Sequence, residues 1–179
     1  MQTLYAKLKD AFQLGEFTER RPDLAFVTVS RDQLRPLLLH LCDREGFTHL
    51  VLLTAVDWIE DGQFQLTYLL NDRAGARDIG VRLMLPRAGA SMDSIHDLWP
   101  TAATYQRELR EMFGIDFPDS PRVDEDFILE GWTDIPPYRR DFDTLQYAHE
   151  AYAERPGRET RDPARYMQEQ LYPDGGNDD

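Results

Sequence analysis

Three consecutive apolar segments with short connections constrain the fold of this chain more than any other feature. The segment FTHLVLLTAVDW (47–58) is nearly all apolar, as expected of a strand buried on both faces. The segments QFQLTYLL (63–70) and RDIGVRLML (77–85) alternate apolar and polar residues, which indicates strands with one buried face. Because the connections IEDG and NDRAGA are short and turn-like, we predict that the three strands form an antiparallel meander.

Apolar residues at helical spacing predict helices before these strands. The spacing indicates a first helix over 3–14, and LAFVTV (24–29) is typical of a short strand. Ser30 and Gln33 predict a capping box at the start of a second helix. Pro36 favours a later start for that helix, because proline lacks the helical hydrogen-bond donor. The apolar face of the second helix consists of Leu34, Leu37, Leu38 and Leu41.

The order of these elements predicts the fold class. A short helix over about 91–97 and a final helix that Pro100 and Thr101 open follow the third strand of the meander. A chain with helix, strand, helix, three strands and helices in that order is expected to be α+β. We predict a two-layer sandwich of a mostly antiparallel sheet with helices on one side, formed by residues 1–114.

The character of the chain changes after Gly114. Residues 115–179 contain seven prolines, many acidic residues and aromatic residues that extend as far as Tyr166 and Tyr172. A disordered tail would be poor in aromatic residues, whereas an arm laid over another protein would use them as anchors. We therefore predict that 115–179 is a long, extended, proline- and acid-rich arm that wraps a partner.

Composition excludes several classes of function. The chain has 20 basic and 33 acidic residues, a net charge of −13, which disfavours binding to nucleic acid and to anionic membrane surfaces. Cys42 is the only cysteine, so the chain alone forms no internal disulfide and holds no cysteine-ligated iron–sulfur cluster. No apolar run is long enough to predict a direct membrane span.

The final helix carries a dense group of charges, for which two interpretations remain open. In QRELRE (106–111), Arg107 can reach Glu111 at i, i+4 as a surface ion pair. Alternatively, Glu108 and Glu111 are an acid–base pair of a free-standing enzyme. Arginine neighbours lower the pKa of a carboxylate, which favours an ion pair over a proton donor near neutral pH. The residues alone indicate a binding or scaffolding protein. An acidic adaptor that belongs to no redox assembly is one form that such a protein could take.

The same helix is part of a recognisable motif. The segment YQRELREMFGIDF (105–117) closely resembles the signature of the C subunit of proton-pumping NADH–quinone oxidoreductase, respiratory complex I. Its core is E-R-E, two variable residues, an acid, an apolar pair and Gly. Arg107 and Glu108 match the triplet, Glu111 stands at the acidic position, and Gly114 is the glycine.

A second motif downstream is similar to the same family. The segment GWTDIPPYRRDF (131–142) resembles a run of aromatic, small and proline residues followed by two basic residues, Asp and an aromatic residue. The whole resemblance covers roughly residues 24–145. The chain departs from the family pattern at Gln106, where Glu is usual, and at Ser120, where His is usual. Acidic residues in PDSPRVDEDF (118–127) also replace the usual basic ones.

The resemblance implies a subunit without catalytic residues of its own. Such a subunit of an NADH–quinone oxidoreductase-like translocase binds no cofactor. It braces the catalytic large subunit and the iron–sulfur subunit in a peripheral arm on the cytoplasmic face of the membrane. The iron–sulfur clusters, and a flavin or nickel–iron site, are expected on partner subunits of this hetero-oligomer. Membrane-bound [NiFe] hydrogenase complexes, including the formate hydrogenlyase type, use a similar subunit. The alternative prediction is that this chain is the equivalent subunit of such a complex.

The resemblance also indicates which side chains face the partners. We predict that the helix at 102–113 and the arm after it form the contact surface. Ionic groups in this surface are expected to set register and partner choice more than affinity. The predicted interface residues are Arg107, Glu108, Glu111, Tyr138, Arg139, Arg140, Asp141 and Phe142.

Overall fold

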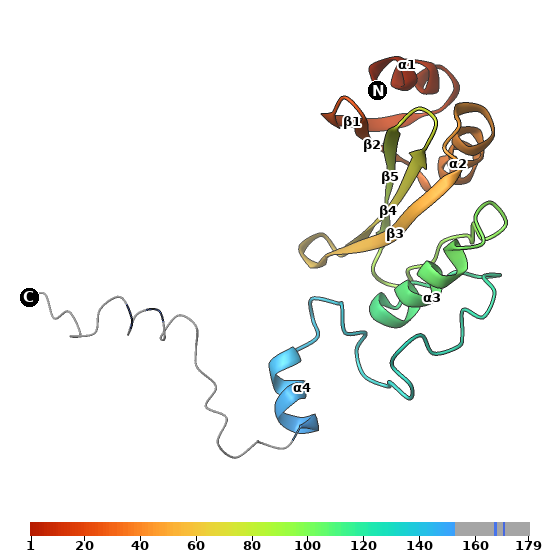
Figure 1. The fold of residues 1–179 in the computed structure, drawn as a ribbon. Coiled ribbons are helices and arrows are strands. Elements are labelled where there is room, and N and C mark those ends of the chain that lie inside the picture. Colours follow the sequence, from red (N-terminus) through yellow and green to blue (C-terminus); the bar gives the residue numbers. More distant parts are fainter. Residues whose placement is uncertain (153–166, 168–169, 171–179) are drawn as a thin grey trace, which may run out of the picture. The chain divides into compact units, whose positions relative to one another are not determined.

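A computed structural model describes residues 1–152, 167 and 170 of the chain (Figure 1). The chain divides into two compact units, of which the first is Met1–Phe142 and the second begins at Asp143. Tyr166 and Tyr172, two of the predicted aromatic anchors, lie outside the described residues. The second unit contains helix α4 (Thr144–Ala151), whose N-cap Asp143 accepts hydrogen bonds from two backbone N–H groups of the first turn.

The first unit is an α+β fold built on a five-stranded sheet. The strand order is β1-β2-β5-β4-β3, with only the β2–β5 pair parallel. The predicted meander is confirmed, because β3 pairs with β4 and β4 with β5, both antiparallel. The elements are α1 (Gln2–Ala11), β1 (Leu14–Arg21), β2 (Leu24–Val29), α2 (Arg31–Glu45), β3 (His49–Trp58), η1 (Ile59–Asp61), β4 (Gln63–Asp72), β5 (Arg77–Pro86) and α3 (Ala102–Phe113).

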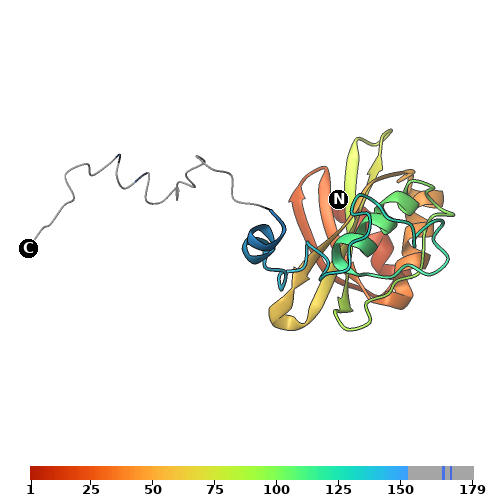
Figure 2. The same cartoon turned by 90° about the horizontal axis from the view of Figure 1, so that it is seen from below.

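Alternation along the strands sorts the side chains onto two faces. In β4 the even-numbered residues from Phe64 to Leu70 are fully buried, whereas their odd-numbered neighbours remain half-exposed. The buried face packs against apolar residues of α1, α2 and α3, and Figure 2 shows α2 and α3 on the same side of the strands. The predicted two-layer sandwich with helices on one side is therefore confirmed, and the other face of the sheet is open.

The prediction that 47–58 is a strand buried on both faces is wrong. Strand β3 lies at an edge of the sheet, where Val56 and Trp58 are exposed on the open face. A register shift between Leu50 and Leu52 disturbs its alternation, so the nearly continuous apolar run misleads. Two side chains protect the outer edge: Trp99 donates to the carbonyl oxygen of Thr48 (3.0 Å), and Tyr105 donates to that of Val51 (2.8 Å).

The N-terminal region contains a strand that the sequence does not predict. Helix α1 ends at Ala11 instead of continuing to residue 14, because Phe12 adopts an extended conformation. Strand β1 then forms the other edge of the sheet. Its sequence LGEFTERR is mostly polar and its side chains are mostly exposed, so it lacks the apolar alternation by which a strand is recognised.

Helix α2 begins without the predicted capping box. Ser30 occupies the N-cap, but its side chain makes no capping hydrogen bond, and the Gln33 amide donates to Asp32 instead. The expectation of a later start is also wrong, because the helix begins at Arg31 and accommodates Pro36 within it. Its C-cap is Gly46, whose φ of 84° is a left-handed conformation that glycine adopts at little cost.

Residues 91–97 form a loop, so the short helix predicted there is absent. Contacts with Arg35 of α2 hold this loop in place of helical hydrogen bonds within it. Its guanidinium donates to the carbonyl oxygen of Ser94 (3.0 Å) and pairs with the carboxylate of Asp97. Contacts from another element therefore fix the loop conformation, which local sequence preferences do not reveal.

Adjacent leucines of α2 provide a test of the packing. Leu38 is 0% exposed and Leu39 is 45% exposed. We predict that Leu38→Ala lowers the free energy of unfolding by about 2–5 kcal/mol, because a buried cavity is left behind. Leu39→Ala, the matched control, should cost less than about 1 kcal/mol. Urea unfolding of both variants measures this difference, and equal losses would contradict the assigned helix orientation.

Candidate functional site

Helix α3 supports most of the candidate site. It ends at Gly114, whose φ of 76° is left-handed, and its apolar face packs on the sheet. Phe113 makes an edge contact with the ring of Phe64 in β4, with ring centroids 5.9 Å apart. The charged residues of QRELRE therefore lie on a helix with a fixed orientation.

Gln106 is a fully buried polar residue of α3 that the helical pattern does not reveal. Its side-chain oxygen accepts hydrogen bonds from the hydroxyl of Ser94 (2.8 Å) and from that of Ser120 (2.7 Å). Gln106 and Ser120 are two of the positions at which the chain departs from the resembled motif. These departures are in direct contact, so the chain has a neutral hydrogen-bonded pair where Glu and His are usual.

Glu111 binds backbone rather than a neighbouring arginine. Its carboxylate accepts hydrogen bonds from the backbone N–H groups of Phe127 (2.6 Å), Ile128 (2.9 Å) and Leu129 (3.1 Å). The predicted Arg107–Glu111 pair is therefore wrong, since the Glu111 oxygens receive donors from a later segment. Glu111 instead fixes the loop that follows α3 to the helix.

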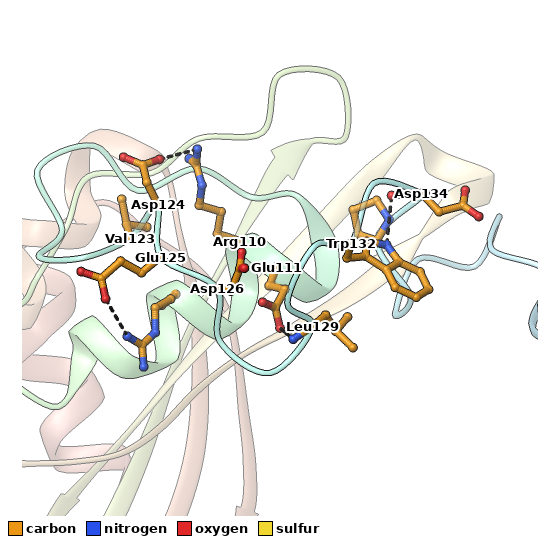
Figure 3. Close-up of a pocket in the computed structure, with 11 residues that line it drawn as sticks. Arg110, Glu111, Val123, Asp124, Glu125, Asp126, Leu129, Trp132 and Asp134 are labelled. Atoms are coloured by element: carbon orange, nitrogen blue, oxygen red, sulfur yellow. Dashed lines mark hydrogen bonds and ion pairs between the residues drawn. The ribbon is translucent and has the colours of Figure 1, made fainter. Parts of the chain in front are cut away.

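The two arginines of α3 contact acidic residues of the same loop, and Figure 3 shows Arg110 pointing towards Asp124. Arg107 lies over the ring of Phe127 and its Nη1 is 4.0 Å from the carboxylate of Glu125. Arg110 pairs with Asp124 (2.6 Å) and also with Asp116. These contacts explain how acidic residues at 118–127 are compatible with the fold, because cations of α3 compensate them.

A polar depression lies between α3 and this loop (Figure 3). Its volume is about 230 Å³ and charged side chains dominate its lining. Glu111 lines the depression but Glu108 does not, so the two carboxylates proposed as an acid–base pair do not share it. With the Glu111 oxygens bound to three N–H groups, the geometry does not support the acid–base interpretation.

A second cluster, which we call the Asp57 cluster, contains Asp57, Arg87, Arg139, Asp141 and the backbone of Arg140. Asp57 is buried at the end of β3. Arg87 Nη2 donates to its Oδ2 (3.0 Å), and Arg87 Nε forms a charge contact of 2.8 Å with Oδ1 that lacks hydrogen-bond geometry. The Arg140 N–H donates to the same Oδ2 (2.9 Å). Asp57 thus fastens a segment 83 residues later to the sheet.

Arg87 extends the Asp57 cluster to Asp141. Its Nη2 donates to Asp141 at 2.8 Å, and Arg139 contacts the same carboxylate at 3.2 Å. Burial raises the pKa of Asp141, but the hydrogen bonds from Arg87 and Arg139 outweigh it and leave this pKa below its usual value. Burial likewise lowers the pKa of Arg87, and its bonds to the two carboxylates more than compensate. Asp141 and Arg87 are therefore both charged at neutral pH.

The remaining predicted interface residues have different surroundings. The side chain of Arg140 pairs with Glu60 at the surface (2.6 Å). Tyr138 packs edge-on against Phe113 and donates its backbone N–H to the Met112 carbonyl, yet its side chain stays exposed. Phe142 contacts the ring of Trp132. The sequence predicts these residues as one surface, and the structure distributes them over the α3 loop and the Asp57 cluster.

Glu108 differs from its charged neighbours on α3. It is half-buried, and residues 1–152 provide no hydrogen bond or ion pair to its carboxylate.

No helix in the described part of the chain is both long and apolar enough to cross a membrane. Within the same residues, no group of three or more His, Cys, Asp or Glu side chains is arranged to hold a metal ion.

Comparison with known proteins gives consistent matches. Residues 27–148 match the family described as "Respiratory-chain NADH dehydrogenase, 30 Kd subunit". The C subunit of the NADH-quinone oxidoreductase of Moorella thermoacetica is 33% identical over 67% of this chain and 80% of its own length. The corresponding C subunit of Citrifermentans bemidjiense is also 33% identical, over 76% of this chain and 85% of its own length.

Solved structures show the same fold. A chain of the membrane-bound sulfane sulfur reductase, described as an archaeal respiratory membrane complex, superimposes with a TM-score of 0.79 at 27% identity. The match covers 90% of this chain and 95% of that one. A trypsin-resistant fragment of Nqo5 has a TM-score of 0.56 at 19% identity, covering 67% of this chain and 96% of the fragment, which supports the fold alone.

Removing the Asp57 carboxylate tests the Asp57 cluster. We predict that Asp57→Ala lowers the free energy of unfolding by about 3–5 kcal/mol, because Arg87 loses the buried one of its two carboxylate partners and the Arg140 N–H loses its acceptor. The matched control is Glu60→Ala, which removes an exposed partner of Arg140 and should cost less than about 1 kcal/mol. Equal losses in urea unfolding would show that the Asp57 cluster does not hold the segment.

A second substitution tests the role of Glu111. Glu111→Gln should lower the free energy of unfolding by about 1–3 kcal/mol, because an amide cannot accept all three backbone hydrogen bonds. Amide hydrogens of residues 127–129 should then exchange faster with solvent. Glu108→Gln on the same helix is the control and should leave these rates unchanged. Unaltered exchange in the Glu111 variant would contradict the assigned contacts.

Proposed function

The chain belongs to the family of respiratory-chain NADH dehydrogenase 30 kDa subunits, and from this we propose that it is an accessory subunit of a membrane-associated, ion-pumping respiratory oxidoreductase. In this proposal the subunit lies in the peripheral arm on the cytoplasmic face of the membrane. It braces the catalytic large subunit and the iron–sulfur subunit beside the path of electrons to quinone. It binds no cofactor, and the clusters and flavin belong to its partners.

The observation that carries the proposal is a firmly held segment with exposed apolar side chains. Glu111 holds residues 127–129 and the Asp57 cluster holds Arg140. Between and beside these attachments, Ile128 is 67% exposed and Tyr138 is 57% exposed. Large apolar groups on a fixed backbone are typical of surfaces that bind another protein, because little conformational entropy is lost on association.

The eight predicted interface residues have two roles in this proposal. Glu108, Tyr138 and Phe142 contact the partner directly. The other five residues are charged and bind within the chain. They set the position of residues 127–142, which we call the contact segment, and present their remaining donors and acceptors at its edge. This second set consists of Arg107, Glu111, Arg139, Arg140 and Asp141. In this proposal residues 115–179 remain the part of the chain that wraps the partner, apart from core residues such as Ile115 and Phe117, which are buried within the first unit.

A second candidate function is the equivalent subunit of a membrane-bound [NiFe] hydrogenase or formate hydrogenlyase-type complex. The similarity to a chain of the membrane-bound sulfane sulfur reductase favours it, because that respiratory complex is not named as an NADH–quinone oxidoreductase. The two candidates differ in the cofactors of the partners. Flavin in the co-purified complex favours the first candidate, and nickel favours the second.

Co-purification tests the proposed function. A tagged form of this chain, isolated from its own cells, should bring down a large subunit and an iron–sulfur subunit. The chain purified alone should contain neither stoichiometric iron nor flavin. Isolation of the chain without either subunit, or iron bound to the chain alone, would overturn the proposal.

The contact role of Tyr138 can be tested in the same system. Tyr138→Ser should weaken the complex by about thirtyfold, as expected for a central aromatic contact. The isolated variant should lose no more than about 1.5 kcal/mol of stability, the size of an aromatic pair contact. Leu39→Ser, which changes an exposed apolar residue of α2, is the control and should leave the dissociation constant unchanged. An unaffected complex in the Tyr138 variant would exclude this contact.

A further inference from the structure

The face of the sheet opposite the helices carries an exposed apolar surface. Val56 in β3 is 44% exposed and Met84 in β5 is 41% exposed, on either side of the half-buried Gln65 in β4. Strand pairing places further apolar side chains on the same face. We call this surface the open face, and it comprises Phe26, Leu52, Val56, Trp58, Leu69, Arg82 and Met84.

The cation Arg82 lies within the open face and is held in a stack with Gly80 and Phe26. Gly80 has no side chain, so the ring of Phe26 lies directly against its backbone, and a Cβ on Gly80 would be 2.2 Å from that ring. The guanidinium of Arg82 then lies over the Phe26 ring at 3.9 Å. Such stacking orients an arginine before any ligand binds.

Arg82 has no acidic partner in the part of the chain that the structure describes. No carboxylate oxygen of these residues lies within 4.0 Å of its guanidinium, and its Nε–H is buried without an acceptor. Burial lowers the pKa of Arg82, Arg20 lowers it further, and Glu16 opposes them from a distance. By contrast, Arg77, Arg87 and Arg110 all pair with carboxylates of the same unit.

We propose that the open face is a second subunit interface, and that an Asp or Glu of the partner subunit binds Arg82 at its centre. The two oxygens of a carboxylate would pair with the two terminal nitrogens of Arg82, and the surrounding apolar side chains would exclude water from the pair. A nucleic acid does not fit this face, because the chain has a net charge of −13. The inference rests on the proposed function only in requiring that the chain is assembled.

This interface is distinct from the contact segment around Tyr138. The open face consists of strands β2 to β5 on the side away from α2 and α3. The contact segment follows α3, which packs on the covered side of the sheet. A subunit with both surfaces lies between two partners, which gives the bracing role a specific geometry.

A zero-length cross-link tests the proposal in the purified complex. Arg82→Lys places an amine near the proposed carboxylate, and carbodiimide treatment joins an amine only to a carboxylate in direct contact. Mass spectrometry should then identify a bond from the introduced lysine to an Asp or Glu of another subunit. Arg73→Lys, in the exposed β4–β5 turn and also without a carboxylate partner in the described residues, is the matched control and should give no such bond.

A loss-of-charge variant gives an independent measurement. Arg82→Gln should dissociate from the complex at least about tenfold faster, because the partner's carboxylate would be left without its counter-charge. The isolated variant should melt no more than a few degrees below the unchanged chain, since it loses the stack on Phe26 but no ion pair with a carboxylate of the described residues.

The outcomes separate this inference from the proposed function. If the complex forms but the introduced lysine gives no cross-link, or one only to Glu16 of the same chain, the inference is overturned and the proposed function is not. Unchanged dissociation of the Arg82→Gln complex also overturns the inference. If no complex forms with the unchanged chain, both are overturned.

Discussion

The buried carboxylate of Asp57 is the interaction on which the rest of the structure depends. It lies at the end of an edge strand, and it binds the guanidinium of Arg87 and the backbone of Arg140 at once. Without it, Arg87 would lose one of its two carboxylate partners and the backbone of Arg140 would lose its acceptor, which weakens the attachment of the segment after α3 to the sheet. Because Arg87, the residue after β5, also binds Asp141, one charged cluster joins the ends of β3 and β5 to the chain around residue 140.

The sheet and α3 together support the segment that follows α3. Glu111 holds the segment at residues 127–129, and the Asp57 cluster holds it near Arg140, so the backbone between them is fixed at both ends. The charges of α3 are thus directed at the chain's own loop. They position exposed apolar side chains such as Ile128 and Tyr138, which suits a protein whose function is to bind its neighbours.

The sequence predicts the parts of this structure that local periodicity determines. The meander, the apolar face of α2 and the confirmed α+β sandwich follow from alternation and helical spacing. The strand β1 does not, because an edge strand with charged side chains has no apolar alternation. The pairing of Asp57 with Arg140 spans 83 residues, and the contact of Gln106 with Ser120 crosses a turn. Such pairings depend on the tertiary fold, so a motif identifies the residues without indicating what they bind.

The most direct test of the account is the structure of the assembled complex, determined by electron cryo-microscopy. The account predicts that Glu108 and Tyr138 are buried against another subunit while Asp57, Arg87 and Asp141 keep their contacts within this chain. A map in which the segment from residue 127 to 142 faces solvent, with the Asp57 cluster broken, would contradict it.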